Sequence, residues 1–348
     1  MKTITISDVA KYANVSKSTV SQFLNQRYDY MSEKTKQKIE AAIQELNYQP
    51  NFVARSLKQK STFTVGVVVA NILHTFSTQV IRAVEDYFHE QGFHIIVCNA
   101  DDEPEKEKKY IEMLRAKQVD GIIIFPTGEN LSLYEKMKRD TFPVVFMDRT
   151  IKELGIPTVM LDNHHAAGLA VDRFIESGIK RIAIITTSII REISPRVERI
   201  EGYKKALDRH GMMVRDEYIK TADAADISIV LSELFSLEEP PKAILAANDI
   251  VLVEVLKYMK EHDMTIPDKA AVIGIDEVPF AGFFTPPITT IVQPAAEMAR
   301  KAGSLLLRQI QEKDGGEKRI HRYKPASLRS QGNPDNRFHC INRFTPAI

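Results

Sequence analysis

Short apolar runs alternate with helix-like segments from residue 64 onward, and no other feature limits the possible folds as much. Runs typical of buried strands occupy 65–70, 95–98, 122–125 and 144–147, and segments that favour helices lie between them at 78–91, 105–117 and 131–138. The alternation then begins again, with strand-like runs at 159–161, 182–186, 218–221, 243–246 and 271–275. Such alternation produces parallel sheets covered by helices on both faces. The sequence therefore predicts two doubly wound α/β lobes and a last helix at 294–312.

The first 49 residues follow a helical pattern with no strand-like runs. A first helix is predicted from the apolar spacing i, i+3, i+4 and i+7 of Ile6, Val9, Ala10 and Ala13. Ser16 and Ser32 are expected to cap a second helix at 17–24 and a third helix, and Asn14 tolerates the positive φ of a tight turn. The three helices share one apolar face. On spacing alone, a helix-turn-helix that enters a major groove and an ordinary helical hairpin with a solvated face are both possible.

The distribution of charge favours the DNA-binding alternative. Residues 1–60 carry ten Lys or Arg and five Asp or Glu, a net charge of +5, whereas the rest of the chain carries 37 and 41, a net charge of −4. A positive excess at one end of a nearly neutral protein indicates a polyanionic partner at that end.

Composition otherwise describes an ordinary soluble protein, with 27% charged and 44% apolar residues. The two cysteines, Cys98 and Cys340, give no disulfide framework and no thiolate metal site. The N-terminus has no secretory signal, and no apolar run approaches the ~18 residues of a membrane span. We therefore expect a cytoplasmic location and no membrane partner.

Three segments of the N-terminal region carry a family resemblance: DVAKYANVSKSTVSQFLN at 8–25, EKTKQKIEAAIQELNYQPN at 33–51 and ARSL at 54–57. They closely resemble the headpiece of the LacI/GalR bacterial transcriptional repressors. Two positions depart from the family pattern, because Asn14 replaces the usual Gly and Gln22 replaces a base-reading Arg. Since Gln reads adenine where Arg reads guanine, the preferred operator half-site should differ from the usual one.

The later segments KQVDGIIIFP, VMLDNHHAAG and IPDKAAVIGIDEVP are also similar to this family. The resemblance implies an N-terminal all-α helix-turn-helix headpiece and an α/β effector domain of two lobes like those of periplasmic sugar-binding proteins. It also implies crossings between the lobes near residues 160, 288 and 320. The expected parts are the headpiece at 1–49, a hinge helix and linker at 50–61, lobe 1 at 62–161 and 288–319, lobe 2 at 162–287 and 320–330, and a loose tail at 331–348.

The same resemblance implies which residues contact operator DNA. Lys17, Ser18 and Gln22 are expected to face bases, and Thr19, Ser21 and Asn25 to face phosphates. Arg55 and Leu57 of the hinge are expected to enter the minor groove, where an apolar wedge can kink the duplex. The expected set is completed by Thr5, Ser16, Asn51 and Ala54. The implied partner is double-stranded operator DNA bound by a homodimer.

Polar residues follow several of the predicted strands. Ligands of doubly wound sheets collect beyond the carboxyl ends of the strands. Any one of these residues could simply cap a helix or lie at the surface, but their convergence favours a ligand cleft. They include residues 71–77, 148–149, 162–163, 248–249 and 276–277, together with Arg196 and Arg199 at the start of a helix.

Roles within this cleft come from the resemblance. Asp276 matches an aspartate that holds ligand hydroxyls, Arg199 a ligand-binding arginine, and Asn248 a ligand-binding amide. Phe76 could stack on a sugar ring, and His74 makes the pocket unusual for the family. Arginine forks match carboxylates, so Arg149, Arg196 and Arg199 together suit an anionic, hydroxylated ligand. The expected effector is a sugar or sugar acid, with 2-keto-3-deoxygluconate as one candidate, and the chain lacks an aromatic residue at 222–224 for stacking on a purine.

Enzyme signatures are absent from the sequence, which has no GxGxxG, P-loop or GxSxG motif. The adjacent residues His164 and His165 point apart on a helix, so they favour a solvated pair over a metal site. We therefore expect no catalytic residues, no cofactor and no metal. The alternatives are the same fold controlled by a phosphoprotein or nucleobase co-effector, a sugar-modifying enzyme, or a sugar-binding transport protein, which the basic headpiece argues against.

Overall fold

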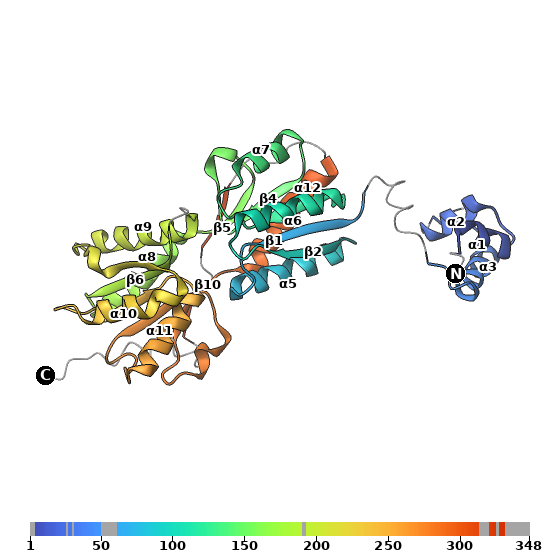
Figure 1. The fold of residues 1–348 in the computed structure, drawn as a ribbon. Coiled ribbons are helices and arrows are strands. Elements are labelled where there is room, and N and C mark those ends of the chain that lie inside the picture. The colour runs from blue at the N-terminus through green and yellow to red at the C-terminus, as the bar shows by residue number, and fades with distance from the viewer. Residues whose placement is uncertain are drawn as a thin grey trace. The chain divides into compact units, whose positions relative to one another are not determined.

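The structure is a computed structural model that describes residues 4–25, 27–29, 31–49, 61–189, 193–312, 320–324 and 327–330. The chain divides into two compact units, Met1–Phe63 and Thr64–Ile348 (Figure 1). The predicted hinge helix and the tail at 331–348 lie outside the described residues. The two-lobed fold class predicted from the alternating pattern is confirmed within the larger unit.

The headpiece contains three helices around a small apolar core. They are α1 (Ile6–Tyr12), α2 (Lys17–Leu24) and α3 (Glu33–Glu45). Val9, Val20 and Ile39, one from each helix, are fully buried in the same cluster. Asn14 adopts a φ of 51° in the turn between α1 and α2, as its tolerance of positive φ predicts. Burial of this shared face leaves the opposite side of α2 open to solvent.

Lobe 1 is a parallel six-stranded sheet in the order β11-β5-β4-β3-β1-β2. Its strands are β1 (Thr64–Val69), β2 (His94–Asn99), β3 (Gly121–Ile124), β4 (Val144–Met147), β5 (Thr158–Leu161) and β11 (Ile320–Tyr323). One face is covered by α5 (Thr75–Glu90) and α12 (Ala295–Glu312), and the other by α6 (Pro104–Ala116) and α7 (Leu131–Arg139) (Figure 1). A short 3-10 turn, η1 (Lys152–Leu154), precedes β5.

Lobe 2 repeats this plan in the order β12-β10-β9-β8-β6-β7, with only β12 antiparallel to its neighbour. Its strands are β6 (Ile182–Thr187), β7 (Ile219–Ala222), β8 (Ala243–Ala246), β9 (Ala271–Ile275), β10 (Thr289–Val292) and β12 (Ser327–Ser330). Helices α8 (Asn163–Glu176) and α9 (Ser194–Arg209) cover one face, and α10 (Ile227–Phe235) and α11 (Asp249–Glu261) the other. Three 3-10 turns complete the lobe: η2 (Asp216–Tyr218), η3 (Ala224–Asp226) and η4 (Pro279–Phe283).

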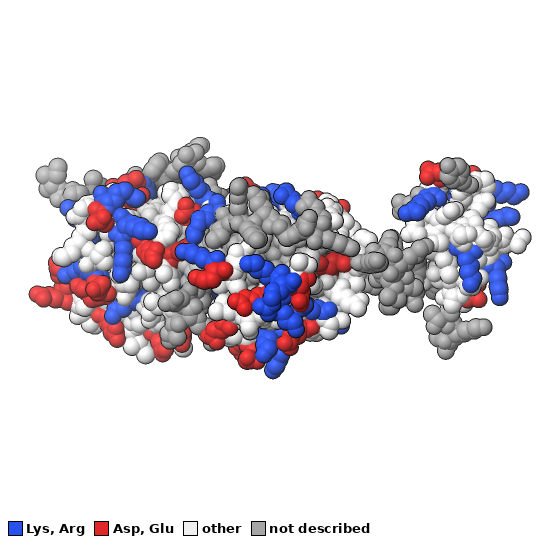
Figure 2. Space-filling model, turned by 90° about the horizontal axis from the view of Figure 1, so that it is seen from above, with Lys and Arg blue, Asp and Glu red and all other residues white. Residues whose placement is uncertain are grey.

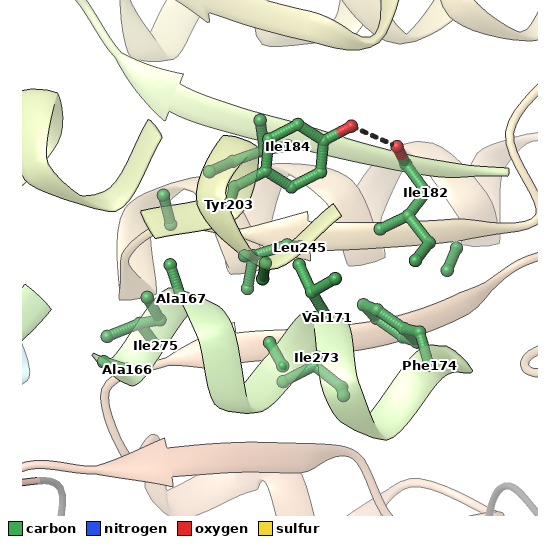
Figure 3. Close-up of a cluster of buried hydrophobic side chains, with 14 of the residues drawn as sticks. Ala166, Ala167, Val171, Phe174, Ile182, Ile184, Tyr203, Leu245, Ile273 and Ile275 are labelled. Carbon is green, nitrogen blue, oxygen red and sulfur yellow. Dashed lines mark hydrogen bonds between the residues drawn. The ribbon is translucent and has the colours of Figure 1, made fainter. Parts of the chain in front are cut away.

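The core beneath α8 and α9 shows how this lobe is held together (Figure 3). Val171 and Phe174 of α8 pack with Tyr203 of α9 over the strand residues Ile184 and Ile273, and all five side chains are fully buried. The Tyr203 hydroxyl donates to the Ile182 carbonyl at 2.6 Å, which satisfies the one polar group that this aromatic ring brings into the core.

The chain crosses between the lobes after Leu161, after Val292 and after Tyr323. The predicted boundaries at 288 and 320 are therefore wrong by a few residues. The strand β10, which the sequence pattern did not reveal, still belongs to lobe 2, and β11 belongs to lobe 1. The prolines at 286 and 287 break the pattern before β10 begins, whereas the crossing occurs only where that strand leaves its sheet.

Candidate functional site

The outer face of α2 carries the side chains predicted to read DNA. The Ser16 hydroxyl accepts a hydrogen bond from the Thr19 backbone N–H at 3.1 Å, so Ser16 caps the helix as expected. At the other end, the Asn25 amide donates to the Ser21 carbonyl at 2.7 Å. The residues at 17, 18, 22 and 25 are exposed and those at 19 and 21 are partly buried. The helix therefore presents a polar stripe wide enough for a major groove.

The other predicted DNA contacts have different positions. Thr5 lies at the start of α1, where its hydroxyl donates to the Asp8 carboxylate at 2.6 Å. Asn51, Ala54, Arg55 and Leu57 lie outside the described residues. In Figure 2, Lys and Arg predominate on the visible face of the headpiece, whereas both signs of charge are mixed over the lobes.

A polar pocket lies between the two lobes of the larger unit. All seven residues predicted to bind an effector line it: His74, Phe76, Arg149, Arg196, Arg199, Asn248 and Asp276. The pocket encloses about 40 Å³, which leaves room for roughly one water molecule. A wider chamber of about 450 Å³ shares His74, Ile193 and Arg196 with the pocket and continues between the lobes. The structure thus brings the predicted residues together in one cleft between the lobes.

His74 of lobe 1 contacts lobe 2 directly. Its ring Nδ1 lies 2.6 Å from Asp249 Oδ1, and the Thr75 backbone N–H donates to Asp249 Oδ2 at 2.6 Å. Burial acts to lower the pKa of His74, but the hydrogen bond and charge of Asp249 outweigh it, and the pKa is raised. From the sequence, Asp249 belongs to the polar residues that follow the strands, with a helix cap as the alternative, but the cap of α11 is Asn248. His74 and Asp249 therefore form a latch between the lobes.

Arg149, also from lobe 1, is neutralised by carboxylates of its own lobe. Its Nη1 donates to Asp102 Oδ1 at 2.8 Å, and its Nε lies 3.9 Å from Asp148 Oδ2. Burial acts to raise the pKa of Asp102, but the charge and the hydrogen bond of Arg149 together outweigh it, and the pKa is lowered. Phe76 is nearly buried and meets Phe125 edge to face, with 6.5 Å between ring centroids.

The two arginines of lobe 2 form no direct ion pair among the described residues, although carboxylates lie near both: Asp102 and Asp148 act on the charge of Arg196, and Arg199 acts on that of Asp276. Arg196 donates to the Ser188 carbonyl at 2.6 Å, and Arg199 donates to Asn163 Oδ1 at 2.9 Å and to the Ala247 carbonyl. Burial, and then the charge of Arg149, lower the pKa of Arg196 to about 10. Two positive groups thus line the pocket with no directly ion-paired carboxylate among the described residues, an arrangement that an anionic ligand would stabilise.

Asp276 lies deep in the same pocket. Burial raises its pKa to about 6, even though the nearby charge of Arg199 acts to lower it. Its Oδ1 accepts a hydrogen bond from Gln293 Nε2 at 2.5 Å, and its backbone φ is 85°. Gln293 was not predicted, because the strand that precedes it was not recognised. Its buried Oε1 has no hydrogen-bond partner among the described residues, so it can accept a ligand hydroxyl.

Both polar groups of the Asn248 side chain form hydrogen bonds within the protein. Its Oδ1 accepts from the Val251 backbone N–H at 2.8 Å as the N-cap of α11, and its Nδ2 donates to Thr187 Oγ1 at 3.2 Å.

Across the described residues there is no group of three side chains suited to hold a metal ion. None of the described helices is both long and apolar enough to cross a membrane.

A helix-turn-helix headpiece and a two-lobed α/β unit with a polar pocket between its lobes define an effector-responsive DNA-binding regulator. Residues 5–51 match the family model of bacterial regulatory proteins of the lacI family, and residues 171–329 match the periplasmic binding protein-like domain. The probable HTH-type transcriptional regulator EndR of Paenibacillus polymyxa is 49% identical, over 89% of this chain and 92% of the relative.

The segment YDYMS at residues 28–32 suggests a likeness to KdgR, which is a more distant relative than EndR. The HTH-type transcriptional regulator KdgR of Bacillus subtilis (strain 168) is 34% identical, over 91% of this chain and 94% of the relative. The crystal structure of the Lac repressor bound to ONPG is 26% identical with a TM-score of 0.81, over 94% and 98% of the two chains. The chain belongs to the LacI family and is a transcriptional repressor. Its relatives are regulators rather than enzymes.

Proposed function

We propose that this repressor controls carbohydrate or sugar-acid utilisation genes and that an anionic, hydroxylated effector releases it from its operator. The exposed side chains of α2 supply the base and phosphate contacts, and two headpieces of a homodimer occupy two half-sites. Effector binding changes the closure of the lobes. Such a change alters operator affinity through a coupling free energy of about 1–3 kcal/mol.

The chemistry of the ligand is inferred from one observation, the pair Arg196 and Arg199, which line the pocket and form no direct ion pair among the described residues. A sugar carboxylate would satisfy their guanidinium groups with charge-assisted hydrogen bonds. The free Oε1 of Gln293 and the carboxyl group of Asp276 are placed to accept sugar hydroxyls. A neutral sugar would use only the second set of groups, and a flat nucleobase would leave most of them unpaired.

The size of the closed pocket bears on how the ligand enters. Pockets that bind small molecules usually enclose about 300–1,000 Å³, far more than the roughly 40 Å³ found here. A sugar acid therefore has to extend into the adjoining chamber of about 450 Å³, or the lobes have to open, for it to bind. The latch between His74 and Asp249 opposes this opening, so ligand binding and lobe closure are linked.

A thermal-shift series tests the ligand class. Purified protein is melted with D-galacturonate, D-gluconate and 2-keto-3-deoxygluconate, and with the uncharged D-galactose and D-glucose as matched controls. We expect at least one acid to raise the melting temperature, because a ligand that binds only the folded state stabilises it. Stabilisation by the neutral sugars alone would contradict an anionic effector. For an acid that binds, operator affinity measured by fluorescence anisotropy should fall when the acid is added.

A substitution in α2 tests operator reading. Gln22→Ala should relax the preference at one base pair of each half-site, with a mismatch effect of about 1–3 kcal/mol. Lys17→Ala serves as the comparison: if Lys17 reaches a phosphate instead of a base, its loss should weaken binding to all sequences more evenly and reduce the salt dependence. Binding-site selection on random DNA measures both. A Gln22→Ala profile identical to that of the wild type would show that Gln22 reads no base.

A further inference from the structure

A chain of hydrogen bonds, buried at the pocket and partly buried at its far end, leads from the pocket to strand β11 of lobe 1. Arg199 Nε donates to Asn163 Oδ1 at 2.9 Å, and Asn163 Nδ2 donates to Glu198 Oε2 at 3.3 Å. Both carboxylate oxygens of Glu198 accept from the guanidinium of Arg322, at 2.8 and 2.7 Å. Arg322 lies on β11, so the chain connects a pocket arginine to a residue outside the pocket.

Each member of the chain fixes the orientation of the next. The parallel pair of bonds from Arg322 holds the Glu198 carboxylate in one plane, which is the strongest geometry available to an arginine. Glu198 then holds the amino end of the fully buried Asn163 amide, whose second partner is the Leu161 carbonyl. With its amino end fixed, the amide presents its oxygen to Arg199.

The backbone around Asn163 allows this arrangement because α8 and α9 approach closely. A Cβ atom at Gly202 would lie 2.5 Å from the His164 carbonyl oxygen, so only glycine permits the approach. Asn163 is the first residue of α8, and Glu198 and Arg199 lie on the facing turns of α9. Asn163, Glu198 and Arg199 of the network therefore lie on a closely packed helix pair of lobe 2.

Two ends of the network lie on the segments that join the lobes. Leu161 is the last residue of β5, directly before the chain enters lobe 2, and Arg322 lies on β11, two residues before the described part of lobe 1 ends. A rotation of one lobe against the other would displace Arg322 and Leu161 relative to α8 and α9. Such a displacement would reach Arg199 through two hydrogen-bonded side chains.

We propose that Arg322 is a positioning residue that acts through Glu198 and Asn163. It fixes the orientation of the Arg199 guanidinium for ligand binding and couples that orientation to the angle between the lobes. The part that concerns ligand binding rests on the proposed function, whereas the positioning of Arg199 does not. Supporting groups of this kind are what hold a binding side chain in its productive geometry.

The first test needs no ligand. The Arg199 Nε–H signal is assigned in nitrogen-15 spectra of the full chain by its loss in Arg199→Lys, and its exchange with solvent is measured. In Arg322→Gln we expect this exchange to accelerate by about tenfold or more, because local opening exposes the bond to water. Arg322→Lys restores the charge without the planar fork and should rescue the protection only in part.

Arg209→Gln is the matched control. Arg209 of α9 donates to both carboxylate oxygens of Asp172 on α8, at 2.6 and 2.8 Å, but this pair is exposed and does not reach the pocket. Its loss should leave the Arg199 signal unchanged. If Arg322→Gln leaves the signal unchanged as well, or if Arg209→Gln perturbs it equally, the proposal is overturned.

The second test uses D-galacturonate as the probe. We expect Arg322→Gln to weaken its binding about three- to tenfold, and the double variant with Arg199→Lys to weaken it less than the two single effects combined. Additive effects would contradict positioning through Arg199. If the wild type does not bind D-galacturonate, that result counts against the proposed ligand class, and the exchange measurement alone decides the role of Arg322.

Discussion

The two lobes share one strand order but differ in how the charged side chains at the pocket are paired. Read from β2 to β11 in lobe 1 and from β7 to β12 in lobe 2, the strand orders correspond position by position. In lobe 1, the pocket arginine Arg149 is paired with Asp102. In lobe 2, Arg196 and Arg199 donate only to an amide oxygen and backbone carbonyls among the described residues. The repeated fold thus carries two different surfaces toward the pocket.

This difference separates two roles. In lobe 1, the pocket arginine is paired with a carboxylate of the same lobe. This lobe also contributes the latch, in which His74 contacts Asp249. Among the described residues, lobe 2 retains two arginines without a direct ion pair and, at the crossing, a Gln293 carbonyl oxygen without a hydrogen-bond partner. Unsatisfied buried groups are costly in an empty protein and favourable once a complementary ligand is bound. We infer that ligand selectivity resides in lobe 2 and that lobe 1 governs access.

The largest effect is expected at the glycines that close a helix pair in each lobe. A Cβ at Gly202 would meet the backbone of α8, at 2.5 Å from the His164 carbonyl oxygen and 2.7 Å from its Cα. A Cβ at Gly303 of α12 would meet only the side chain of Tyr87, which can move. Gly202→Ala should therefore lower the free energy of unfolding by about 1–3 kcal/mol or more, and Gly303→Ala by less.

Gly168→Ala provides the control for these substitutions, because its Cβ would find only ordinary contacts at 3.9 and 4.0 Å. It should be neutral, or stabilising by up to about 1 kcal/mol, since alanine favours helix more than glycine does. Urea unfolding of the three variants gives the comparison. Equal losses of unfolding free energy in the Gly202 and Gly303 variants would show that the backbone contact and the side-chain contact adjust equally well to the added methyl group.

A second effect separates the arginines of the two lobes. Arg196→Gln should weaken binding of a sugar acid about ten- to hundredfold, because a hydrogen bond to a charged group contributes about 1.5–3 kcal/mol. Its melting temperature should remain near that of the wild type, since no ion pair within the described residues is broken. Calorimetric titration and thermal melting measure the two quantities.

Arg149→Gln is the counterpart in lobe 1. It removes the ion-pair partner of Asp102, whose side chain is three-quarters buried, so the melting temperature should fall even without ligand. Were Arg196→Gln to destabilise the empty protein as much as Arg149→Gln does, the two lobes would not differ in charge balance as we infer.

The smallest effect is a difference in pH dependence. Folded Asp276 keeps its proton up to a pKa of about 6, whereas an unfolded aspartate loses it near pH 3.9. Between these values the folded state binds more protons, so this group makes the protein less stable as pH rises. Asp276→Asn should remove this pH-dependent loss of stability. As the pH rises from about 4.5 to 7, the melting temperature of the variant should therefore increase relative to that of the wild type.

Asp102 of lobe 1 should behave in the opposite sense. Burial opposes ionisation of this carboxyl group, but Arg149 outweighs burial and the pKa of Asp102 is lowered in the folded protein. Asp102 therefore contributes stability above the unfolded pKa of about 3.9 and loses it as pH falls through the folded value. The advantage of the wild type over Asp102→Asn should shrink in acid. Melting curves across pH for both variants check the signs, and the same sign for both carboxylates would contradict the assignment.

Much of the architecture follows from local sequence. Continuous apolar runs indicate strands buried on both faces, and helical spacing indicates helices buried on one, so the alternation after residue 63 is sufficient to indicate two parallel α/β lobes. The three headpiece helices and the caps at Ser16 and Ser32 likewise depend on neighbours three or four residues away. Family resemblance and the carboxyl ends of strands then located the seven pocket residues, which the fold brings together.

Only the tertiary structure decided how those residues are paired. His74 and Asp249 are separated by 175 positions, and Glu198 and Arg322 by 124, so no local pattern connects them. The strands β10 and β11 are each four residues long, and their sheet membership is set by pairing partners rather than by their own composition. Local sequence determines which face of a segment is buried, whereas the charge balance of the pocket depends on distant groups that the fold places within hydrogen-bonding distance.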